Sequence, residues 1–458
     1  MPDRFWRLFE DSLGSGNVRT FRDALAQPAV VSIRRNPAKL PEDRFLSLFN
    51  ASDGTDIVPW CHEGRYLNER PSFTLDPLLH CGAYYVQDSS SMFTGALFSL
   101  LLNQCKDQNG LRILDLCAAP GGKTTHLASI LRSSGRPDTL LVSNEAVSSR
   151  VASLAENVAR WGEPNVVVTN SDPSEFIKLK NFFDIILVDA PCSGEGMFRK
   201  DEDSVKEWSE EVVKACATRQ KHILIDAWPA LKSGGFIIYS TCTYNRNEND
   251  SILEWIAAQL GADIIKPDYV PMGVHVTRAG GCQFIPGNIR GEGQYVCMLR
   301  KKGGMNSDAS AKVLHDKKAD DTSCDYVVGD YKLIRKGDLL KAVPARMADE
   351  IATVEQNMAP ISPFRLFIRL FACLGTVRGR YGNRFRLLVE IWIAYNLVES
   401  PSNLRVNKHE PAEENDDDYA SRTGLAKHRN EPLDGNLSIR SAGSAPEKVG
   451  KVRESADV

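Results

Sequence analysis

The chain has 458 residues, of which 42% are hydrophobic and 25% are charged, and its formal net charge is −3. These values are close to those of ordinary globular proteins, so they exclude a wholly disordered chain and a collagen-like fibre. The length predicts more than one domain, and the near-neutral charge means that any nucleic-acid surface must be local.

The cysteines and the first residues narrow the class of protein further. There are 11 cysteines and no Cys-x-x-Cys pair, which disfavours a disulfide scaffold and a zinc knuckle, so no metal is expected. The N-terminal segment MPDRFWRLFED places acidic residues among apolar ones, unlike a signal peptide. No uninterrupted apolar run is long enough to span a membrane. We therefore expect a cytoplasmic protein without a membrane partner.

Two regions with different patterns follow one another along the chain. Residues 1–80 are predicted to be mixed and mainly helical, because Phe5, Leu8 and Phe9 recur at helical spacing. From about residue 110 to 300 short apolar runs alternate with amphipathic helices. We predict strands over 111–116, 140–144, 165–169, 184–189, 235–241 and 294–299, and helices ending at Gly162 and over 209–231 and 251–260. This alternation is typical of an α/β fold with a parallel-rich sheet covered on both faces.

The last third of the chain differs from the rest in composition. Residues 303–324 are polar and predict a linker. A small α/β element is expected from 325 to about 358, followed to 398 by an apolar segment that contains six arginines and one acidic residue. From 399 onward the chain is polar and is predicted to be a disordered tail.

Polar or reactive groups follow five of the predicted strands. Ligands of open parallel sheets bind outside the carboxyl ends of the strands, so these groups are expected to meet at one rim. They lie in 115–123, 144–145, 170–172, 189–196 and 240–243. A sheet with only a structural role would need none of them, and the sequence therefore predicts a ligand site at this rim.

The loop after the first of these strands favours a nucleoside ligand. Its glycines allow close approach to the backbone, and the helix that follows offers N–H groups to an anion. The P-loop pattern requires glycine where Cys117 stands, and Gly-x-Gly-x-x-Gly is absent. Glu145 is placed to accept hydrogen bonds from a ribose, although it could also be a solvated residue near a helix start. A nucleoside that carries a carboxylate, S-adenosylmethionine, fits this combination.

Two cysteines differ from the others in position. Cys192 and Cys242 each follow a predicted strand end in a polar loop, where a thiol can have a lowered pKa and act as a nucleophile. Most of the others are interpreted as small buried hydrophobic residues. Cys117 is intermediate, because it lies in the cofactor loop and is expected to contribute backbone contacts.

Three motifs resemble those of a known family. LDLCAAPGGKTTHLAS (114–129), DAPCSGEGMFRKD (189–201) and YSTCTYNRNEND (239–250) are similar, in sequence and order, to motifs of the Nop/Sun RNA cytosine-5 methyltransferases. The likeness covers about residues 1–302 and is strongest to the branch that acts on bacterial 16S ribosomal RNA. It implies a Rossmann-like S-adenosylmethionine-dependent methyltransferase domain at 81–302, an RNA-facing domain at 1–80 and a partial or aberrant PUA-like region at 325–398.

The resemblance also implies roles for individual residues. Cys242 would attack carbon 6 of cytosine, Cys192 would aid release of the product, and Asp189 would contact the base and the methyl-donor end. The target nucleotide would be unpaired or flipped out of a helix. The residues implied to hold the cofactor are Cys117, Ala118, Ala119, Pro120, Gly121, Gly122, Lys123, Glu145, Arg150, Asp172 and Asp189.

Several alternatives stay open at this point. The same chemistry on transfer RNA is one. A non-catalytic RNA-binding or ribosome-assembly factor is another, disfavoured because a binding module needs neither thiol. The segment after 358 is interpreted either as the product of a shifted reading frame or as a divergent basic RNA-contacting helix pair.

Four polar residues near the start of the chain have two interpretations. They either support the active site or contact RNA, or they pack within the N-terminal domain. These residues are Arg34, Asn36, Gln87 and Asp88. Arg199 and Lys200 are expected either to meet phosphates or to be solvated.

Overall fold

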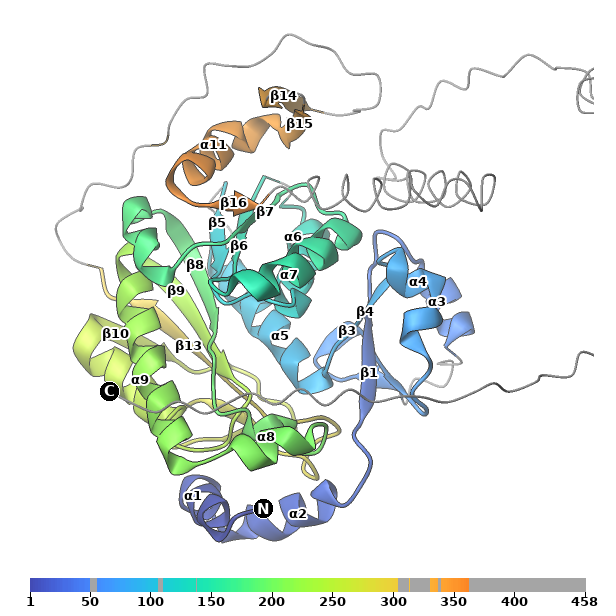
Figure 1. The fold of residues 1–458 in the computed structure, drawn as a ribbon, viewed down its shortest axis with the longest axis vertical. Helices are drawn as coiled ribbons and strands as arrows, with labels where there is room; N and C mark the ends of the chain where they lie inside the picture. Colours follow the sequence, from blue (N-terminus) through green and yellow to red (C-terminus); the bar gives the residue numbers. More distant parts are fainter. Residues whose placement is uncertain are drawn as a thin grey trace, which may run out of the picture. The chain divides into compact units, whose positions relative to one another are not determined.

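The computed structural model describes residues 1–49, 56–105, 110–136, 138–303, 330–336 and 339–361, together with residue 313. Most of the predicted linker, most of the arginine-rich segment and the whole of the predicted tail lie outside these residues. The described chain contains a small N-terminal sheet, a large central sheet and a C-terminal α/β segment (Figure 1).

The central sheet has ten strands, five of which are parallel to one another. The parallel strands are β5 (Arg112–Asp115), β6 (Leu140–Asn144), β7 (Val166–Thr169), β8 (Phe183–Asp189) and β9 (Leu231–Thr241). The antiparallel strands are β10 (Ala262–Ile265), β11 (His275–Val276), β12 (Cys282–Phe284), β13 (Gln294–Lys301) and β16 (Pro360–Ile361). The order is β11-β12-β13-β9-β8-β5-β6-β7-β16, and β10 pairs with β13. All six predicted strands are confirmed, and the last of them runs antiparallel.

Helices cover both faces of this sheet. On one face Ile113 and Ile185 pack against the helix that precedes β5 and the helix that follows it. On the other face Leu114 and Ile186 pack against helices that come later in the chain. Because neighbouring residues of one strand are buried on opposite faces, these strands are nearly continuous apolar runs, which is why they were predictable.

The helices of this domain are longest beside the parallel strands. The first face is covered by α5 (Ser89–Gln104) and α6 (Gly122–Ser133), with α7 (Ser148–Trp161) alongside. The second face is covered by α9 (Glu210–Ala227), α10 (Asp250–Trp255) and the π-helix η5 (Ile256–Gly261). Shorter elements are η2 (Pro173–Leu179), η3 (Glu195–Met197), α8 (Glu202–Glu207) and η4 (Trp228–Ala230).

The N-terminal region contains helices and a small sheet, so the prediction that it is mixed and mainly helical is confirmed, although none of its strands was predicted. Its strands are β1 (Val31–Arg35), β2 (Ile57–Val58), β3 (Cys61–Leu67) and β4 (Tyr84–Val86), in the order β2-β3-β1-β4. Its helices are α1 (Asp3–Leu13), α2 (Ser15–Leu25), α3 (Glu42–Leu48), η1 (Phe73–Leu75) and α4 (Pro77–His80). The sheet thus extends past residue 80 to β4.

The first two helices do not pack on that sheet. Phe5, Phe9 and Phe21 form an aromatic cluster with Phe198, Trp208 and Tyr244 of the central domain. Figure 1 shows α1 and α2 beside α8, apart from β1, β3 and β4. The N-terminal region therefore contacts the central domain at two separate places.

The C-terminal α/β element predicted over 325–358 is present. It consists of β14 (Tyr331–Lys336) paired with β15 (Leu339–Pro344), then η6 (Ala345–Met347), α11 (Ala348–Asn357) and β16. Met347, Ile351 and Val354 are buried in the apolar cluster on the second face of the central sheet. The segment is thus part of the central hydrophobic core.

No helix in the part of the chain that the structure describes is both long and apolar enough to cross a bilayer.

Candidate active site

Cys192 and Cys242 meet at the rim of the central sheet. Cys192 lies three residues after β8 and Cys242 directly follows β9, and β8 and β9 are parallel neighbours. Their sulfur atoms are 3.1 Å apart, and the backbone N–H of Cys242 donates to the sulfur of Cys192 at 3.3 Å. The contact with Cys242, together with burial, raises the pKa of the Cys192 thiol well above its ordinary value. Cys192 is therefore protonated at neutral pH, beside a second sulfur atom.

Two buried glutamates join the loops that carry these cysteines. Glu195 accepts hydrogen bonds from the backbone N–H groups of Tyr244 and Asn245 at 2.8 and 3.0 Å. Glu248 accepts one from the backbone N–H of Ser193 at 3.0 Å. The Asn245 side-chain amide lies between the two carboxylates, 2.9 and 2.8 Å from their oxygen atoms. Each glutamate thus fixes the loop of one cysteine to the loop of the other.

The roles of these two glutamates and of Asn245 were not predicted from the sequence. The available signal was the acidic and amide residues that follow each cysteine within a few positions, in CSGEG and CTYNRNEN. Such residues are common on surfaces, and only the structure shows that Glu195 and Glu248 are buried, with 1% and 0% of their surface exposed.

Asp189 forms an ion pair at the end of β8. One carboxylate oxygen lies 2.8 Å from the Lys123 ammonium group, and the other accepts a hydrogen bond from the Ser240 hydroxyl at 2.6 Å. Lys123 belongs to the first turn of α6, so this pair joins the cofactor loop to the cysteine rim. The predicted positions of Asp189 and Lys123 at one site are thus realised.

The loop from Cys117 to Gly122 passes between β5 and α6. Gly121 has φ = +105°, a conformation that favours glycine. Asp115, at the end of β5, is fully buried and accepts a hydrogen bond from the Thr124 hydroxyl at 2.6 Å. Its other carboxylate oxygen is buried with no partner in the described part of the chain. Burial raises the pKa of Asp115 to about 7.

Glu145 and Arg150 lie together at the second strand end. One Glu145 oxygen accepts a hydrogen bond from the Val147 backbone N–H at 2.9 Å. The other is buried with no hydrogen-bond donor among the described residues, and the nearest guanidinium nitrogen of Arg150 is 3.5 Å away. Arg150 also donates to the carbonyl oxygen of Ala119 at 2.7 Å. Arg150 therefore bridges Glu145 and the loop.

Asp172 stands at the third strand end and is exposed. One of its oxygens caps η2 by accepting from the Ser174 backbone N–H at 3.0 Å. The preceding residues are fixed by the C-terminal segment: the Asn170 N–H donates to the Ala359 carbonyl at 2.8 Å, and the Ala359 N–H donates to the Ser171 hydroxyl at 3.0 Å. The C-terminal segment thus supports this part of the rim.

Two of the four polar residues near the start of the chain, Arg34 and Asn36, support α6 and α7, and Arg34 also donates to the carbonyl oxygen of Gly122 in the cofactor loop at 3.2 Å. Arg34 is fully buried and donates to the side chains of Gln87 and Thr125, each at 2.7 Å. Asn36 donates to the carbonyl oxygens of Gly82 and Trp161. These bonds tie β1 to α6 and α7, so direct contact of Arg34 or Asn36 with RNA is excluded by burial.

Arg199 and Lys200 are paired within the protein. Arg199 donates to the buried Glu292 carboxylate at 2.7 Å, and only 7% of its side chain is exposed. Lys200 lies 3.0 Å from Asp88, which also caps α5. Contact of Arg199 with phosphates is thus excluded by its position.

The residues at the rim fit S-adenosylmethionine. Two buried carboxylate oxygens, one each on Asp115 and Glu145, have no hydrogen-bond donor among the described residues. Buried acceptors are normally satisfied, so these two suit a ligand with hydroxyl and ammonium donors. The N-terminus of α6 provides N–H groups for a carboxylate. No group of three or more potential metal ligands occurs among the described side chains.

Solved structures define the class of this fold. A methyltransferase homologue from Pyrococcus horikoshii is 24% identical, with a TM-score of 0.54 over 66% of this chain and 95% of that one. NSun6 from the same organism, solved with SFG, is 18% identical, with a TM-score of 0.55 over 66% of this chain and 98% of that one. The fold is therefore the Rossmann-like methyltransferase fold.

Sequence comparison gives the family. The model described as 16S rRNA methyltransferase RsmB/F matches residues 100–300, and that of the N-terminal domain of 16S rRNA methyltransferase RsmF matches residues 1–89. The chain belongs to the RsmB/F family, and its N-terminal region is of the RsmF type. The resemblance found in the three motifs is thereby confirmed.

Curated relatives carry the name Ribosomal RNA small subunit methyltransferase F. The protein from Pectobacterium atrosepticum is 37% identical over 319 residues, which are 67% of this chain and 63% of the relative. The one from Shewanella loihica is 35% identical over 317 residues, 66% of this chain and 64% of the relative. The chain thus spans just under two thirds of the length of these relatives.

Proposed function

We propose that this protein methylates carbon 5 of a cytosine in 16S ribosomal RNA through a covalent bond between Cys242 and carbon 6. The observation that carries the proposal is the pair of thiols, Cys192 and Cys242, in contact at the rim of a methyltransferase fold. Membership of the RsmB/F family supports ribosomal RNA as the substrate class.

The chemistry explains why a nucleophile is needed. Carbon 5 of cytosine is a poor nucleophile, and addition of the Cys242 thiolate to carbon 6 gives carbon 5 enamine character. S-adenosylmethionine supplies the methyl group from its sulfonium. Carbon 5 takes this methyl group and then loses its proton to a base, and the electrons of that C–H bond expel the Cys242 thiolate from carbon 6. This step regenerates the Cys242 thiolate and forms 5-methylcytosine.

Cys192 suits the last step rather than the first. Contact with the Cys242 sulfur and burial raise the pKa of the Cys192 thiol, which favours its protonated form. A protonated thiol 3.1 Å from the Cys242 sulfur can donate a hydrogen bond to the departing thiolate. We therefore assign Cys192 to release of the product.

The ion pair of Asp189 and Lys123 suits recognition of the base. The carboxylate offers an acceptor and the ammonium group a donor, which is the pairing that the amino group and ring nitrogen of cytosine require. A donor at the ring nitrogen also stabilises the charge that develops there after addition at carbon 6.

The other rim residues would hold S-adenosylmethionine. Glu145 would accept from the ribose hydroxyls, with Arg150 fixing the loop against it. The stretch from Cys117 to Lys123 would wrap the methionine end, and Asp172 would lie near the adenine. Asp115 joins this set because of its unpaired buried oxygen.

The test is methyl transfer from labelled S-adenosylmethionine to three substrates: naked 16S RNA, assembled small subunits and transfer RNA. We expect 5-methylcytidine, identified by nucleoside analysis, in a 16S-derived substrate and none with the Cys242→Ala variant. Cys105→Ala, which removes a buried thiol at the C-terminal end of α5, is the matched control and should retain activity.

Two results would contradict the proposal. Methylation of transfer RNA alone would assign a different substrate class. Cofactor binding without methylation of any RNA would favour a non-catalytic RNA-binding or assembly factor.

A further inference from the structure

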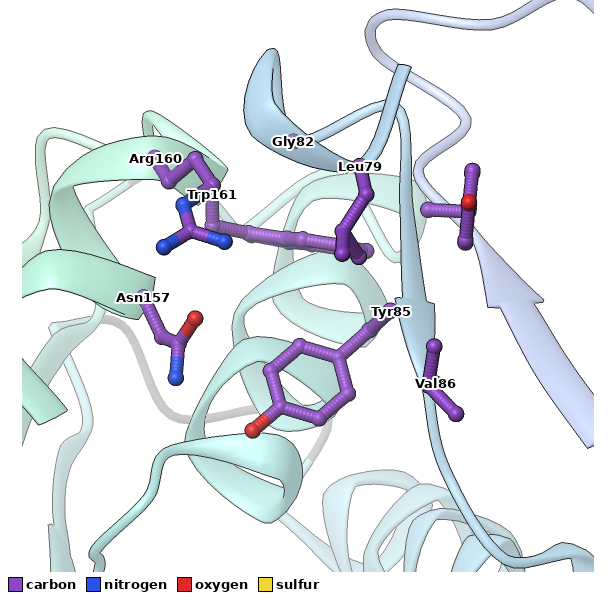
Figure 2. A pocket seen from close by; sticks show the side chains of 8 residues that line it. Leu79, Gly82, Tyr85, Val86, Asn157, Arg160 and Trp161 are labelled. Carbon is purple, nitrogen blue, oxygen red and sulfur yellow. The ribbon is translucent and has the colours of Figure 1, made fainter. Parts of the chain in front are cut away.

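A hollow lies between the N-terminal sheet and the end of α7, outside the rim described above. It has a volume of about 200 Å³, and its walls include Leu79, Tyr85, Asn157, Arg160 and Trp161. Figure 2 shows the Tyr85 ring, the Asn157 amide and the Arg160 guanidinium around this space. The hollow is smaller than the ~300–1,000 Å³ pockets that enclose drug-sized ligands, so it suits a fragment about the size of one nucleobase.

The side chains around the hollow are held in place. The Tyr85 hydroxyl and the Asn157 amide both donate to the carbonyl oxygen of Pro120, at 3.4 and 2.8 Å. Trp161 contacts the Tyr85 ring edge to face, with the ring centroids 6.5 Å apart, and Arg34 covers the Trp161 ring at 4.6 Å from its centroid. A half-buried aromatic ring fixed in this way is a preformed surface for stacking.

The polar groups of the hollow suit the edge of a base. Arg160 pairs with Glu156 through one of its terminal nitrogens, and 20% of its side chain is exposed. The Asn157 carbonyl oxygen has no donor among the described residues, because only its amide nitrogen is engaged. The hollow therefore combines a stacking ring, a cationic donor and a neutral acceptor, as proteins that bind unpaired nucleotides do.

We propose that this hollow binds a single unstacked nucleobase of the substrate RNA, separate from the target cytosine. The inference rests on the proposed function for the identity of the RNA. The base stacks on Tyr85, and Arg160 and Asn157 hydrogen-bond to its edge. Because Pro120 belongs to the cofactor loop, a bound base would also stiffen the loop that adjoins it.

The test measures RNA affinity and cofactor affinity separately on the full chain. A fluorescein-labelled unpaired 16S RNA fragment is titrated by anisotropy, and S-adenosylhomocysteine is titrated by calorimetry. Tyr85→Leu removes the ring, whereas Tyr85→Phe keeps the ring and removes only the hydroxyl that contacts Pro120. Tyr269→Leu, at a tyrosine that is 68% exposed elsewhere, is the surface control.

We expect Tyr85→Leu to weaken RNA binding at least about fivefold, since base–aromatic stacking contributes ~1–3 kcal/mol per base. Tyr85→Phe and Tyr269→Leu should stay within about twofold of the wild type, and Arg160→Gln should weaken binding about threefold or more. The slope of log Kd against log salt should not change for Tyr85→Leu, because no phosphate contact is lost.

Two outcomes would overturn the proposal. Equal RNA affinity of Tyr85→Leu and the wild type is one. The other is a loss of S-adenosylhomocysteine affinity in Tyr85→Leu as large as its loss of RNA affinity, because Tyr85 would then only support the cofactor loop. Should Tyr85→Leu not fold, ultraviolet crosslinking of the wild type decides, since RNA must then crosslink to the peptide with Tyr85 or to that with 157–161. Binding without methylation would overturn the proposed function and leave this site standing.

Discussion

At the scale of single residues, the loops of the two cysteines are held by the carboxylates of Glu195 and Glu248, which have no ion pair within the described structure. Glu195 receives four N–H hydrogen bonds, from two backbone groups and from the side chains of Trp208 and Asn245. Burying a carboxylate is costly unless such donors surround it. This cost is consistent with a role in fixing the 3.1 Å approach of the two sulfur atoms.

The substitution Glu248→Gln tests this role. Both oxygens of Glu248 accept hydrogen bonds from N–H donors. In the glutamine variant an NH2 group replaces one of these oxygens and therefore faces another N–H donor without an acceptor. We expect the free energy of unfolding in urea to fall by about 1–3 kcal/mol. We also expect kcat to fall while cofactor affinity is retained, because the altered loops carry the cysteines.

Glu254→Gln is the matched control, since Glu254 is 46% exposed and pairs with Arg246. An exposed ion pair contributes roughly 0–1 kcal/mol, so this variant should keep its kcat and most of its stability. Equal effects of the two substitutions on kcat would argue against a positioning role for Glu248.

Asp115 gives a prediction about pH. Burial raises its pKa from 3.8 to about 7 in the folded protein. Between these values the folded state binds more protons than the unfolded state, so the free energy of unfolding falls as pH rises. Asp115→Asn lacks this titration. The free energy of unfolding of the wild type should therefore fall relative to that of the variant from pH 4 to 7, and the difference should be constant above pH 7. Urea unfolding without cofactor measures it.

A stability difference that is independent of pH over this range would show that Asp115 titrates normally. Cofactor affinity offers a second readout, because the variant loses the unpaired carboxylate oxygen. We expect weaker binding of S-adenosylhomocysteine to Asp115→Asn at neutral pH.

At the scale of elements, the C-terminal segment is joined to the methyltransferase domain. β16 pairs with β7 and covers what would otherwise be an edge of the central sheet. Ile361 packs against the apolar cluster that contains Val168 and residues of α7 and the cofactor loop, and Ile351 of α11 is 1% exposed in the main cluster. The domain that binds the cofactor therefore continues beyond residue 302.

This continuity predicts how α11 contributes to unfolding. Ile351→Ala should lower the free energy of unfolding by about 2–5 kcal/mol, the usual range for a fully buried isoleucine. A single transition should be seen by circular dichroism and by tryptophan fluorescence. Ile177→Ala, at a residue that is 59% exposed in η2, should change stability by less than about 0.5 kcal/mol. A separate early transition in the Ile351→Ala protein would mean that the segment unfolds on its own.

The elements that could be predicted from sequence are those buried on both faces. Strands such as 184–189 are continuous apolar runs, and five polar loops after them marked the rim. The N-terminal sheet was missed because β1 ends in Arg34 and Arg35, which are buried yet polar. The antiparallel direction of β13 could not be predicted either, because an apolar run carries no sign of chain direction.

The candidate site was predictable at the level of residues but not of contacts. Cys192, Cys242 and Asp189 were identified from their motifs. The ion pair with Lys123 and the backbone hydrogen bonds to the two glutamates join residues 49 or more positions apart, and such pairing depends on the register of β8 and β9. Arg199 resembled a surface residue for the same reason, since its partner Glu292 is 93 positions away.

At the scale of the whole molecule, the N-terminal region contacts both halves of the proposed site. α1 and α2 pack against the segment that carries Phe198 and Tyr244, next to the cysteines. β1 and β4 contact α6 and α7, beside the cofactor loop.

The covalent step is the central claim, and trapping it is the most direct test. Cys192→Ala protein is mixed with labelled 16S RNA and S-adenosylmethionine, and the mixture is run on a denaturing gel. If Cys192 serves product release, a protein–RNA adduct should accumulate, and it should be absent from the Cys192→Ala/Cys242→Ala double variant. An adduct that persists without Cys242, or none in an active Cys192→Ala protein, would contradict the assignment of the two thiols.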